Sequence, residues 1–290
     1  MRWRTALALG RVSNLPTVWT NSLAGVVLAG GAIDLRLPLL LLATSAFYVG
    51  GMWLNDAFDR AIDAEQRPER PIPSGEVGAR AVFGTGFGLL GLGLLLLVWI
   101  GFGFAAGTGI WPVLGGLGLA AAIVLYDAWH KNNPASPLLM GLCRVLVYVT
   151  AGLAVVAALP WTLAGGALAL LCHLIGLTYV AKQETLDEVG NLWPLLFLMA
   201  PPVYGATVGG FDSVSGALIW LGFVACLGFA LVLLIRRRPG DVARAVVGLI
   251  AGISLLDGLL IAAAGAPGLA WLGPLGFLLT LVLQRWIAGT

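Results

Sequence analysis

Residues 37–63 read LPLLLLATSAFYVGGMWLNDAFDRAID, an apolar run long enough to cross a lipid bilayer that ends in three acidic residues. Asp56, Asp59 and Asp63 stand at positions i, i+3 and i+7, so a continuous helix places them on one narrow face. Carboxylates on one face repel one another, and hard divalent cations, which prefer oxygen ligands, relieve that repulsion. The stretch predicts a membrane helix whose acidic end binds such a cation. A solvated helix end with incidental acids is the alternative.

The composition of the whole chain also indicates a lipid environment. Of its 290 residues, 59% are hydrophobic and 10% are charged, whereas a soluble domain has about 25% charged residues. The mean hydropathy is +0.96. Too few polar groups are available to cover a surface in water, so we expect an integral membrane protein in contact with lipid. The net charge of +2 is too small to indicate nucleic-acid binding, and the three cysteines lack the spacing of metal ligands.

Ten apolar stretches of about 20 residues are candidates for transmembrane helices. Nine is the alternative count, because Gly265, Pro267 and Gly268 could form a re-entrant bend. We therefore expect an all-α integral membrane protein, one domain over residues 1–290, with nine to ten transmembrane helices. The first helix is expected to be retained, because no small-residue cleavage site follows it. The expected helices cover residues 14–33, 37–57, 78–103, 108–127, 136–158, 162–182, 192–209, 214–235, 242–264 and 268–288.

Basic residues are distributed unevenly over the loops between these helices. With the N-terminus in the cytoplasm, 15 of the 16 arginine and lysine residues fall on the inner side, and only Arg36 faces outward. Such an excess is typical of cytoplasmic loops. The sequence predicts a protein of a bacterial inner (cell) membrane, with its N-terminus and its acidic helix end at the cytoplasmic side.

Polar residues reveal a possible internal repeat with an offset of 128 residues. When the sequence is shifted by this offset, one pair of amides, two pairs of acids and a last pair of oxygen-bearing side chains fall on matching positions. Both sets of residues lie at the ends of apolar helices. The pattern indicates an ancient duplication of a four-helix unit, with two oxygen-rich helix ends facing each other across a central cavity. Chance coincidence is the alternative. The matched pairs are Asn55 with Gln183, Asp56 with Glu184, Asp59 with Asp187, and Asp63 with Asn191.

Two such clusters favour Mg²⁺ bound together with a phosphate-bearing ligand. Mg²⁺ keeps several of its waters and binds through one or two carboxylates plus substrate phosphates. Basic side chains are the other half of a phosphate site, and prolines stiffen the loop that follows the first cluster. Anchoring of the loops at the membrane surface is the alternative role of these basic residues. The candidates are Arg67, Arg70, Lys131, Arg144 and Lys182.

The string Asn55-Asp56-x-x-Asp59-x-x-x-Asp63, followed by Arg67-Pro-x-Arg70-Pro-Ile-Pro-Ser-Gly, resembles a known motif. It is similar to the first aspartate-rich motif and loop of the UbiA superfamily of intramembrane prenyltransferases. The likeness includes Asn14-Leu-Pro-Thr17 at the start of the first helix, and Tyr126 with Lys131 at the end of the fourth. As a helix pattern it covers essentially the whole chain, and its specific part is the first motif with its loop.

The resemblance implies a helical bundle around a cavity that opens laterally to lipid. In that family, Mg²⁺ held by two acidic motifs binds the diphosphate of an isoprenyl donor, and an aromatic or other lipophilic acceptor captures the allylic cation. Prenyl diphosphate, acceptor and membrane lipid are then the expected partners. With the repeat, the resemblance gives Asp56, Asp59, Asp63, Glu184 and Asp187 as the catalytic and metal-binding residues. The expected substrate-binding residues are Asn14, Asn55, Arg67, Arg70, Tyr126, Lys131, Arg144, Lys182, Gln183 and Asn191.

The second motif departs from the family pattern of D-x-x-D-x-x-x-D. It reads Glu184-x-x-Asp187-x-x-x-Asn191, in which Glu lengthens one side chain and Asn removes one charge. A divergent, EboC-like branch of the superfamily is one interpretation. Two further hypotheses keep the same fold: a non-catalytic protein that binds or transports an isoprenoid or lipid metabolite, and an intramembrane terpene cyclase. Asp257 lies within an apolar helix, one turn from Ser254, and we expect a structural or acceptor-orienting role for it.

Overall fold

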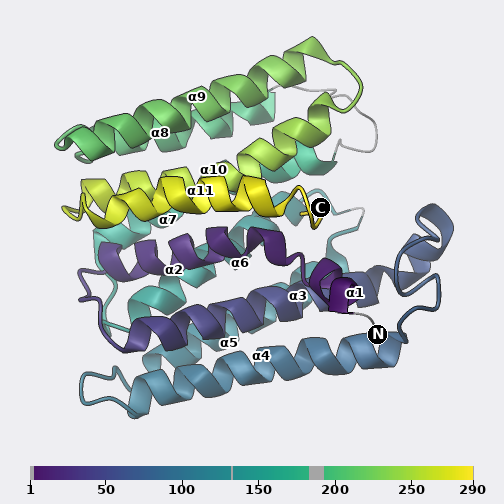
Figure 1. Cartoon of the computed structure of the whole chain (residues 1–290). Helices are drawn as coiled ribbons and strands as arrows, with labels where there is room; N and C mark the ends of the chain where they lie inside the picture. Colours follow the sequence, from purple (N-terminus) through teal and green to yellow (C-terminus); the bar gives the residue numbers. More distant parts are fainter. Residues whose placement is uncertain (1–2, 132, 183–192, 290) are drawn as a thin grey trace.

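The computed structural model describes residues 3–131, 133–182 and 193–289, and this part of the chain is helical without any strand. The long helices lie side by side and run back and forth along one direction (Figure 1). The prediction of an all-α protein is confirmed. The elements are α1 (Trp3–Leu9), η1 (Val12–Asn14), α2 (Leu15–Leu28), α3 (Arg36–Gln66), α4 (Ala79–Phe102), α5 (Trp111–Trp129), α6 (Ser136–Leu153), α7 (Trp161–Lys182), η3 (Trp193–Met199), α8 (Ala200–Thr207), α9 (Val214–Arg236), α10 (Asp241–Ala263), η4 (Leu269–Trp271) and α11 (Leu272–Leu283).

Seven helices in the described ranges are long and apolar enough to cross a membrane: α3, α4, α5, α6, α7, α9 and α10. Each of the ten predicted stretches contains helix, but α2, η3 with α8, and η4 with α11 form shorter elements. In the second of these, Pro201 and Pro202 occupy the first turn of α8. Proline has no N–H group, so these residues cannot donate α-helical hydrogen bonds back into η3, and η3 and α8 are separate elements. The exact count of nine or ten spanning helices is not confirmed.

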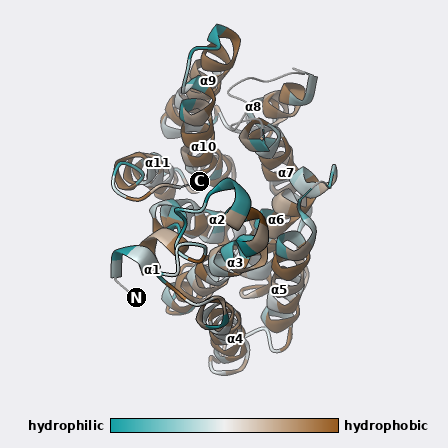
Figure 2. Cartoon of the chain, turned by 90° about the vertical axis from the view of Figure 1, so that its right-hand side faces the viewer, coloured by the Kyte–Doolittle hydropathy of each residue, from teal (hydrophilic) through white to brown (hydrophobic). Residues whose placement is uncertain are grey.

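The outer surface of the bundle is apolar. Leu95 on α4, Ile235 on α9 and Leu278 on α11 are more than half exposed. Figure 2 looks at the bundle from one end, where hydrophilic segments gather, while the helix bodies are hydrophobic. This arrangement requires lipid around the helix bodies and water at the ends.

Helix α10 is the central element of the C-terminal half, and 89% of its membrane-spanning window is buried. It packs against α2, α7, α9 and α11. Glycine makes two of the neighbouring contacts possible: a Cβ on Gly273 would lie 2.7 Å from Cα of Gly258, and a Cβ on Gly25 would lie 2.7 Å from the carbonyl oxygen of Tyr148. The backbones of α10 and α11, and of α2 and α6, therefore approach closely.

One end of the bundle contains both chain termini, the end of α3, the 67–78 loop and the turn between α5 and α6 (Figure 1). A small apolar cluster of Leu9, Trp53, Ala57, Val77 and Val82 holds α1 and this loop against α3. The loop that carries Arg70 is thereby fixed beside the acidic residues of α3. We call this end of the bundle the charged end.

Arg36 lies at the opposite end. Its guanidinium pairs with Asp34 at 2.7 Å and donates to the carbonyl oxygens of Ala106, at 2.5 Å, and Ala154, at 3.0 Å. The hydrogen bond from Arg36 lowers the pKa of Asp34 below its usual value. Arg36 therefore joins three connections between helices: those from α2 to α3, from α4 to α5 and from α6 to α7.

Candidate active site

A cavity of about 510 Å³ extends from the charged end into the bundle, with walls from α2, α3, α5, α6, α7 and α10. At the charged end it is lined by Asp59, Asp63, Arg70 and Lys131. Farther along the same helices the lining is mostly apolar, with Arg144 as its charged member. It includes Phe47, Leu119, Ile123, Val147, Leu177 and Ile253. The space combines a charged end with a hydrophobic interior.

Two of the three acids at the end of α3 line this cavity. Asp59 and Asp63 do so directly, whereas Asp56 lies behind the wall, and all three are buried. Arg70 Nη1 lies 2.9 Å from Asp63 Oδ2 and 3.4 Å from Asp56 Oδ1. Helix α3 is continuous to Gln66, so Asp56 and Asp63 lie on one face, as the spacing predicts, and Arg70 contacts both carboxylates.

Asp59 has two basic partners from the end of α5. Lys131 Nζ lies 3.2 Å, and His130 Nε2 3.4 Å, from its Oδ2. The His130 ring in turn stacks on Tyr126, with ring centroids 4.8 Å apart. Asp56 has a second partner in Arg11, whose Nη2 lies 3.2 Å from Oδ1. The repulsion among the acids is thus offset by the positive charges of Arg11, Arg70 and Lys131.

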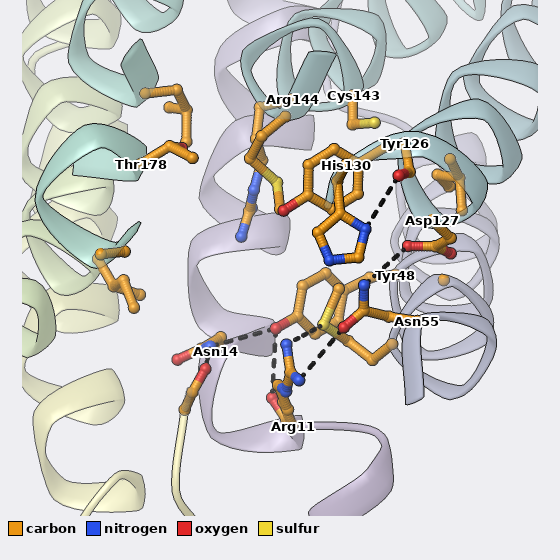
Figure 3. Close-up of a pocket in the computed structure, with 18 of the residues that line it drawn as sticks. Arg11, Asn14, Tyr48, Asn55, Tyr126, Asp127, His130, Cys143, Arg144 and Thr178 are labelled. Carbon is orange, nitrogen blue, oxygen red and sulfur yellow. Dashed lines mark hydrogen bonds between the residues drawn. The ribbon is translucent and has the colours of Figure 1, made fainter. Parts of the chain in front are cut away.

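Asn55 links the acidic end of α3 to α5. Its Nδ2 donates to Asp127 Oδ1 at 3.2 Å, and its Oδ1 accepts from Arg11 Nη2 at 3.4 Å. Both Asn55 and Asp127 line the cavity (Figure 3). Asp127 Oδ2 is buried without a hydrogen-bond partner among the described residues. Asp127 therefore adds a fourth carboxylate to the site.

The oxygen donors fit a Mg²⁺ ion that also binds substrate oxygens. Within the part of the chain that the structure describes, no three His, Cys, Asp or Glu side chains are grouped as a complete metal site. Mg²⁺ characteristically takes one or two carboxylates and completes its shell with water and phosphate, so Asp59 and Asp63 meet this requirement.

Four other residues predicted at the site line the same cavity: Asn14, Arg67, Tyr126 and Lys182. Asn14 donates to Tyr48 at 3.2 Å and to the carbonyl oxygen of Gly289 at 2.9 Å. Lys182 donates to Ser136 Oγ at 2.9 Å, which holds the end of α7 against the start of α6.

Arg144 lies deeper in the cavity, on α6. Its guanidinium carbon is 5.4 Å from the centroid of the Tyr48 ring, and its Nη1 donates to Asn21 Oδ1 at 2.9 Å. Figure 3 shows Arg144 and Tyr48 from different helices beside the same space. Of the predicted basic candidates, Arg144 is the one on the interior part of a helix.

Gln183, Glu184, Asp187 and Asn191 lie outside the described residues. The metal-binding role of the second motif and the internal repeat therefore stay predictions. Lys182, the last residue of α7, lines the cavity, and the second motif follows it in the sequence.

Four residues that sequence analysis did not select belong to the site: Arg11, Tyr48, Asp127 and His130. Arg11 counted only as one more basic residue, yet it adopts left-handed backbone geometry with φ of 41° between α1 and η1, and it reaches the acids of α3. No periodic pattern marks such a turn. Asp127 and His130 adjoin Tyr126 and Lys131 in the sequence, and this proximity was the available signal.

Residues 17–188 match the model of the UbiA prenyltransferase family. The chain belongs to this family. The match covers more than half of the chain, and the resemblance inferred from the first acidic motif is confirmed.

Among curated relatives, three proteins named digeranylgeranylglyceryl phosphate synthase illustrate the similarity. The protein from Methanopyrus kandleri is 34% identical over 93 residues, 31% of this chain and 34% of the relative. That from Methanoregula boonei is 32% identical over 133 residues, 45% and 44% of the two chains. That from Thermococcus kodakarensis is 24% identical over 223 residues, 77% of this chain. The matched regions span 34 to 58% of the length of these relatives.

This UbiA family member has the same fold as solved structures of UbiA homologues. The apo structure of a UbiA homologue from Aeropyrum pernix K1 superposes with a TM-score of 0.68 at 14% identity, covering 87% of this chain and 97% of the other. A UbiA homologue from Archaeoglobus fulgidus bound to GPP and Mg²⁺ superposes with a TM-score of 0.59 at 15% identity, covering 91% and 99%. The protein is an integral membrane protein with the UbiA fold.

Proposed function

We propose that the protein is a Mg²⁺-dependent prenyltransferase that transfers an isoprenyl group from its diphosphate to a lipophilic acceptor within the membrane. The observation that carries this proposal is the continuity of the cavity, which joins Asp59, Asp63, Arg70 and Lys131 to an apolar interior. A prenyl diphosphate has the same division into a polyanionic head and a hydrocarbon chain. Family membership and the homologue bound to GPP and Mg²⁺ support the same donor and metal.

The metal would be held by Asp59 and Asp63, with Asp56 and Asn55 beside them on α3. The sequence motif adds Glu184 and Asp187 as further candidate ligands. Bound Mg²⁺ neutralises charge on the diphosphate leaving group. Arg70, Lys131 and Arg11 supply further positive charge to the same oxygens, together with Tyr126 as a hydrogen-bond donor. Such groups accelerate a reaction because they stabilise charge that develops in the transition state.

The apolar walls have two tasks in this proposal. Phe47, Leu119 and Val147 would hold the hydrocarbon chain of the donor, and they keep water from the reactive carbon. Water would otherwise capture an allylic cation and give a prenyl alcohol. A dry cavity therefore favours transfer to the acceptor over hydrolysis.

We further propose that the acceptor is a lipid with a phosphate head group and that the charged end faces the cytoplasm. The names of the relatives, digeranylgeranylglyceryl phosphate synthase, support a glyceryl phosphate acceptor. Arg144 supports an anionic head group within the cavity, because its guanidinium lines the cavity and, among the described residues, donates a hydrogen bond to Asn21 alone, which leaves N–H donors for a ligand. The concentration of basic residues near the charged end supports the orientation.

The test uses purified protein in lipid nanodiscs with radiolabelled geranylgeranyl diphosphate, Mg²⁺ and a geranylgeranylglyceryl phosphate acceptor. We expect a labelled lipid product that is lost when EDTA removes Mg²⁺ and when Asp59→Asn is introduced. Tight binding of the donor without release of pyrophosphate would replace this proposal with a carrier function. Release of pyrophosphate with a cyclic hydrocarbon as product would replace it with a terpene cyclase.

A further inference from the structure

Asp257 is a fully buried carboxylate in the middle of α10 and does not line the cavity. Its Oδ2 accepts from Thr20 Oγ1 at 2.5 Å and from Asn21 Nδ2 at 2.8 Å. Its Oδ1 accepts from Asn21 Nδ2 at 2.9 Å and from Tyr148 OH at 2.5 Å. An ionised carboxyl group can only accept hydrogen bonds, and here α2 and α6 supply the donors.

Asn21 connects this carboxylate to Arg144 in the cavity wall. Its Nδ2 faces both oxygens of Asp257, so its Oδ1, on the other side of the same planar amide, faces Arg144. The carboxylate thus determines which end of the amide Arg144 meets. With an amide at position 257, the Asn21 side chain could turn over and present N–H groups to the guanidinium, which has no acceptor for them.

The Arg144 guanidinium has N–H donors that no described residue uses. A guanidinium has five N–H donors, and among the described residues the hydrogen bond to Asn21 is the one that Arg144 donates. One of its faces lies over the Tyr48 ring. Arg144 is eight residues from the start of α6, or about 12 Å along a helix axis, so it is separated from Lys131 and the acids at the charged end.

We infer that Asp257 is a positioning residue: through Asn21 it holds the Arg144 guanidinium toward the cavity, where Arg144 binds the anionic head group of a lipophilic acceptor. The inference rests on the proposed function and deepens it. The planar guanidinium suits a phosphate or carboxylate group, to which it donates two parallel hydrogen bonds. Asp257 also supplies the negative charge that a buried arginine needs, without occupying its ligand-binding edge.

The experiment separates this role from general support of the fold. Thr20 and Tyr148 bind the same carboxylate and form no hydrogen bond with Arg144 among the described residues, so Thr20→Val and Tyr148→Phe are the matched controls. Asp257→Asn is the main variant. Asn21→Ser is the second, because it keeps a hydroxyl donor near Asp257 and removes the oxygen that Arg144 uses. Arg144→Gln gives the full effect of losing the guanidinium.

Binding of decyl phosphate and of decanol is measured by calorimetry on nanodisc-embedded protein, with saturating Mg²⁺ and inorganic pyrophosphate to fill the charged end. We expect Asp257→Asn, Asn21→Ser and Arg144→Gln to weaken decyl phosphate binding about tenfold or more, with decanol binding unchanged. The two controls should lower the melting temperature and leave both affinities within about twofold.

Decyl phosphate affinities that follow the loss of melting temperature across all five variants, or an unchanged affinity in Asp257→Asn or Asn21→Ser, would overturn the inference. Pyrophosphate binding to the wild type is recorded separately in the presence of Mg²⁺. If the wild type binds no pyrophosphate, the proposed prenyl transfer fails, while the decyl phosphate series, run without pyrophosphate, still tests the role of Asp257.

Discussion

The acids at the end of α3 share their cations with the proposed substrate. Arg70 contacts Asp63 and Asp56, Lys131 contacts Asp59, and each cation belongs to a segment next to α3 and not to α3 itself. A diphosphate offers these cations a stronger negative partner than a single carboxylate does. We therefore expect substrate binding and metal binding to be coupled, because a cation that turns to phosphate leaves its carboxylate available to Mg²⁺.

Lys131→Gln is expected to lower kcat/KM for the prenyl diphosphate about 100-fold, because a positive charge beside the leaving group is lost. The measurement is the initial rate of product formation at several donor concentrations. Arg80→Gln is the matched control, because Arg80 begins α4 near the charged end and does not line the cavity. Equal losses in both variants would contradict a specific role for Lys131.

Arg70→Gln is expected to have opposite effects on the two ligands of the site. Mg²⁺ should bind more tightly when no phosphate is added, because Arg70 no longer competes for Asp56 and Asp63, whereas pyrophosphate should bind more weakly. Titrations of each ligand, followed by the shift in melting temperature, measure both. Arg67→Gln serves as control, since Arg67 lines the cavity and forms no ion pair with a described acidic residue. A parallel change of both affinities would refute the shared-cation interpretation.

At the scale of single residues, the spacing in the sequence predicts that the aspartates share a face of the helix. It does not predict the contacts between residues far apart in the sequence. Asp56, Asp59 and Asp63 share a face because helix periodicity alone places them there. Arg11 reaches Asp56 across 45 residues, and Asn55 reaches Asp127 across 72. Such contacts depend on how α1, α3 and α5 pack, which no short pattern in the sequence records.

Helices α2, α6 and α10 meet around the buried polar group at Asp257, and small residues allow that meeting. Gly25 contacts the backbone of Tyr148, the residue that donates to Asp257. Close approach of backbones is the main source of helix association in lipid, where apolar side chains gain little from leaving the bilayer. The polar network and the glycine contacts thus depend on one another.

The same substitution at two glycines is expected to act in opposite directions. Gly25→Ala places a Cβ 2.7 Å from the Tyr148 carbonyl oxygen and 2.8 Å from Ala151 Cβ, so α2 must move away from α6, at a cost of about 1–3 kcal/mol. Gly84→Ala on α4 meets no atom within 4 Å and should stabilise by about 0.5–1 kcal/mol, because alanine favours a helix. Melting temperatures in one detergent compare the two. A stable Gly25→Ala would mean that the contact between α2 and α6 is looser than the structure indicates.

Helix positions followed well from hydrophobicity, but helix lengths did not. The windows at 37–57 and 214–235 correspond to α3 and α9, although α3 continues to Gln66, beyond the apolar run. The apolar run ends at Leu54, whereas α3 continues to Gln66, and in this last part Asp59 and Asp63 pair with Lys131 and Arg70. In the window at 192–209, prolines divide the segment into η3 and α8, and apolar composition alone does not show this division.

The whole molecule is a bundle around a cavity of about 510 Å³, and we expect the size of this cavity to limit the ligand. Its apolar lining comes from helices that are far apart in the sequence, including α3, α5, α6 and α10. The sequence predicts that a cavity exists, through the family resemblance, but not its shape, because the shape depends on which side chains of six helices meet.

Val147→Trp is expected to shift the preferred donor toward shorter prenyl diphosphates, because Val147 is a buried residue of the apolar lining and tryptophan fills that space. Rates with geranyl, farnesyl and geranylgeranyl diphosphate give the profile. Leu95→Trp is the control, since Leu95 is 69% exposed on the outer face of α4. An unchanged profile in Val147→Trp, with normal folding, would indicate that the donor chain does not pass this residue.

The contacts of Arg36 have a consequence for the way in which bulky hydrocarbons enter and leave. One guanidinium ties Asp34 to the carbonyl groups of Ala106 and Ala154, so three interhelical connections are fastened together far from the acids. Helices joined in this manner are held together at the end that contains Arg36 and are free of these ties at the charged end. We therefore expect the helices to separate at the charged end when a hydrocarbon ligand exchanges, and Arg36→Leu to allow the other end to open as well.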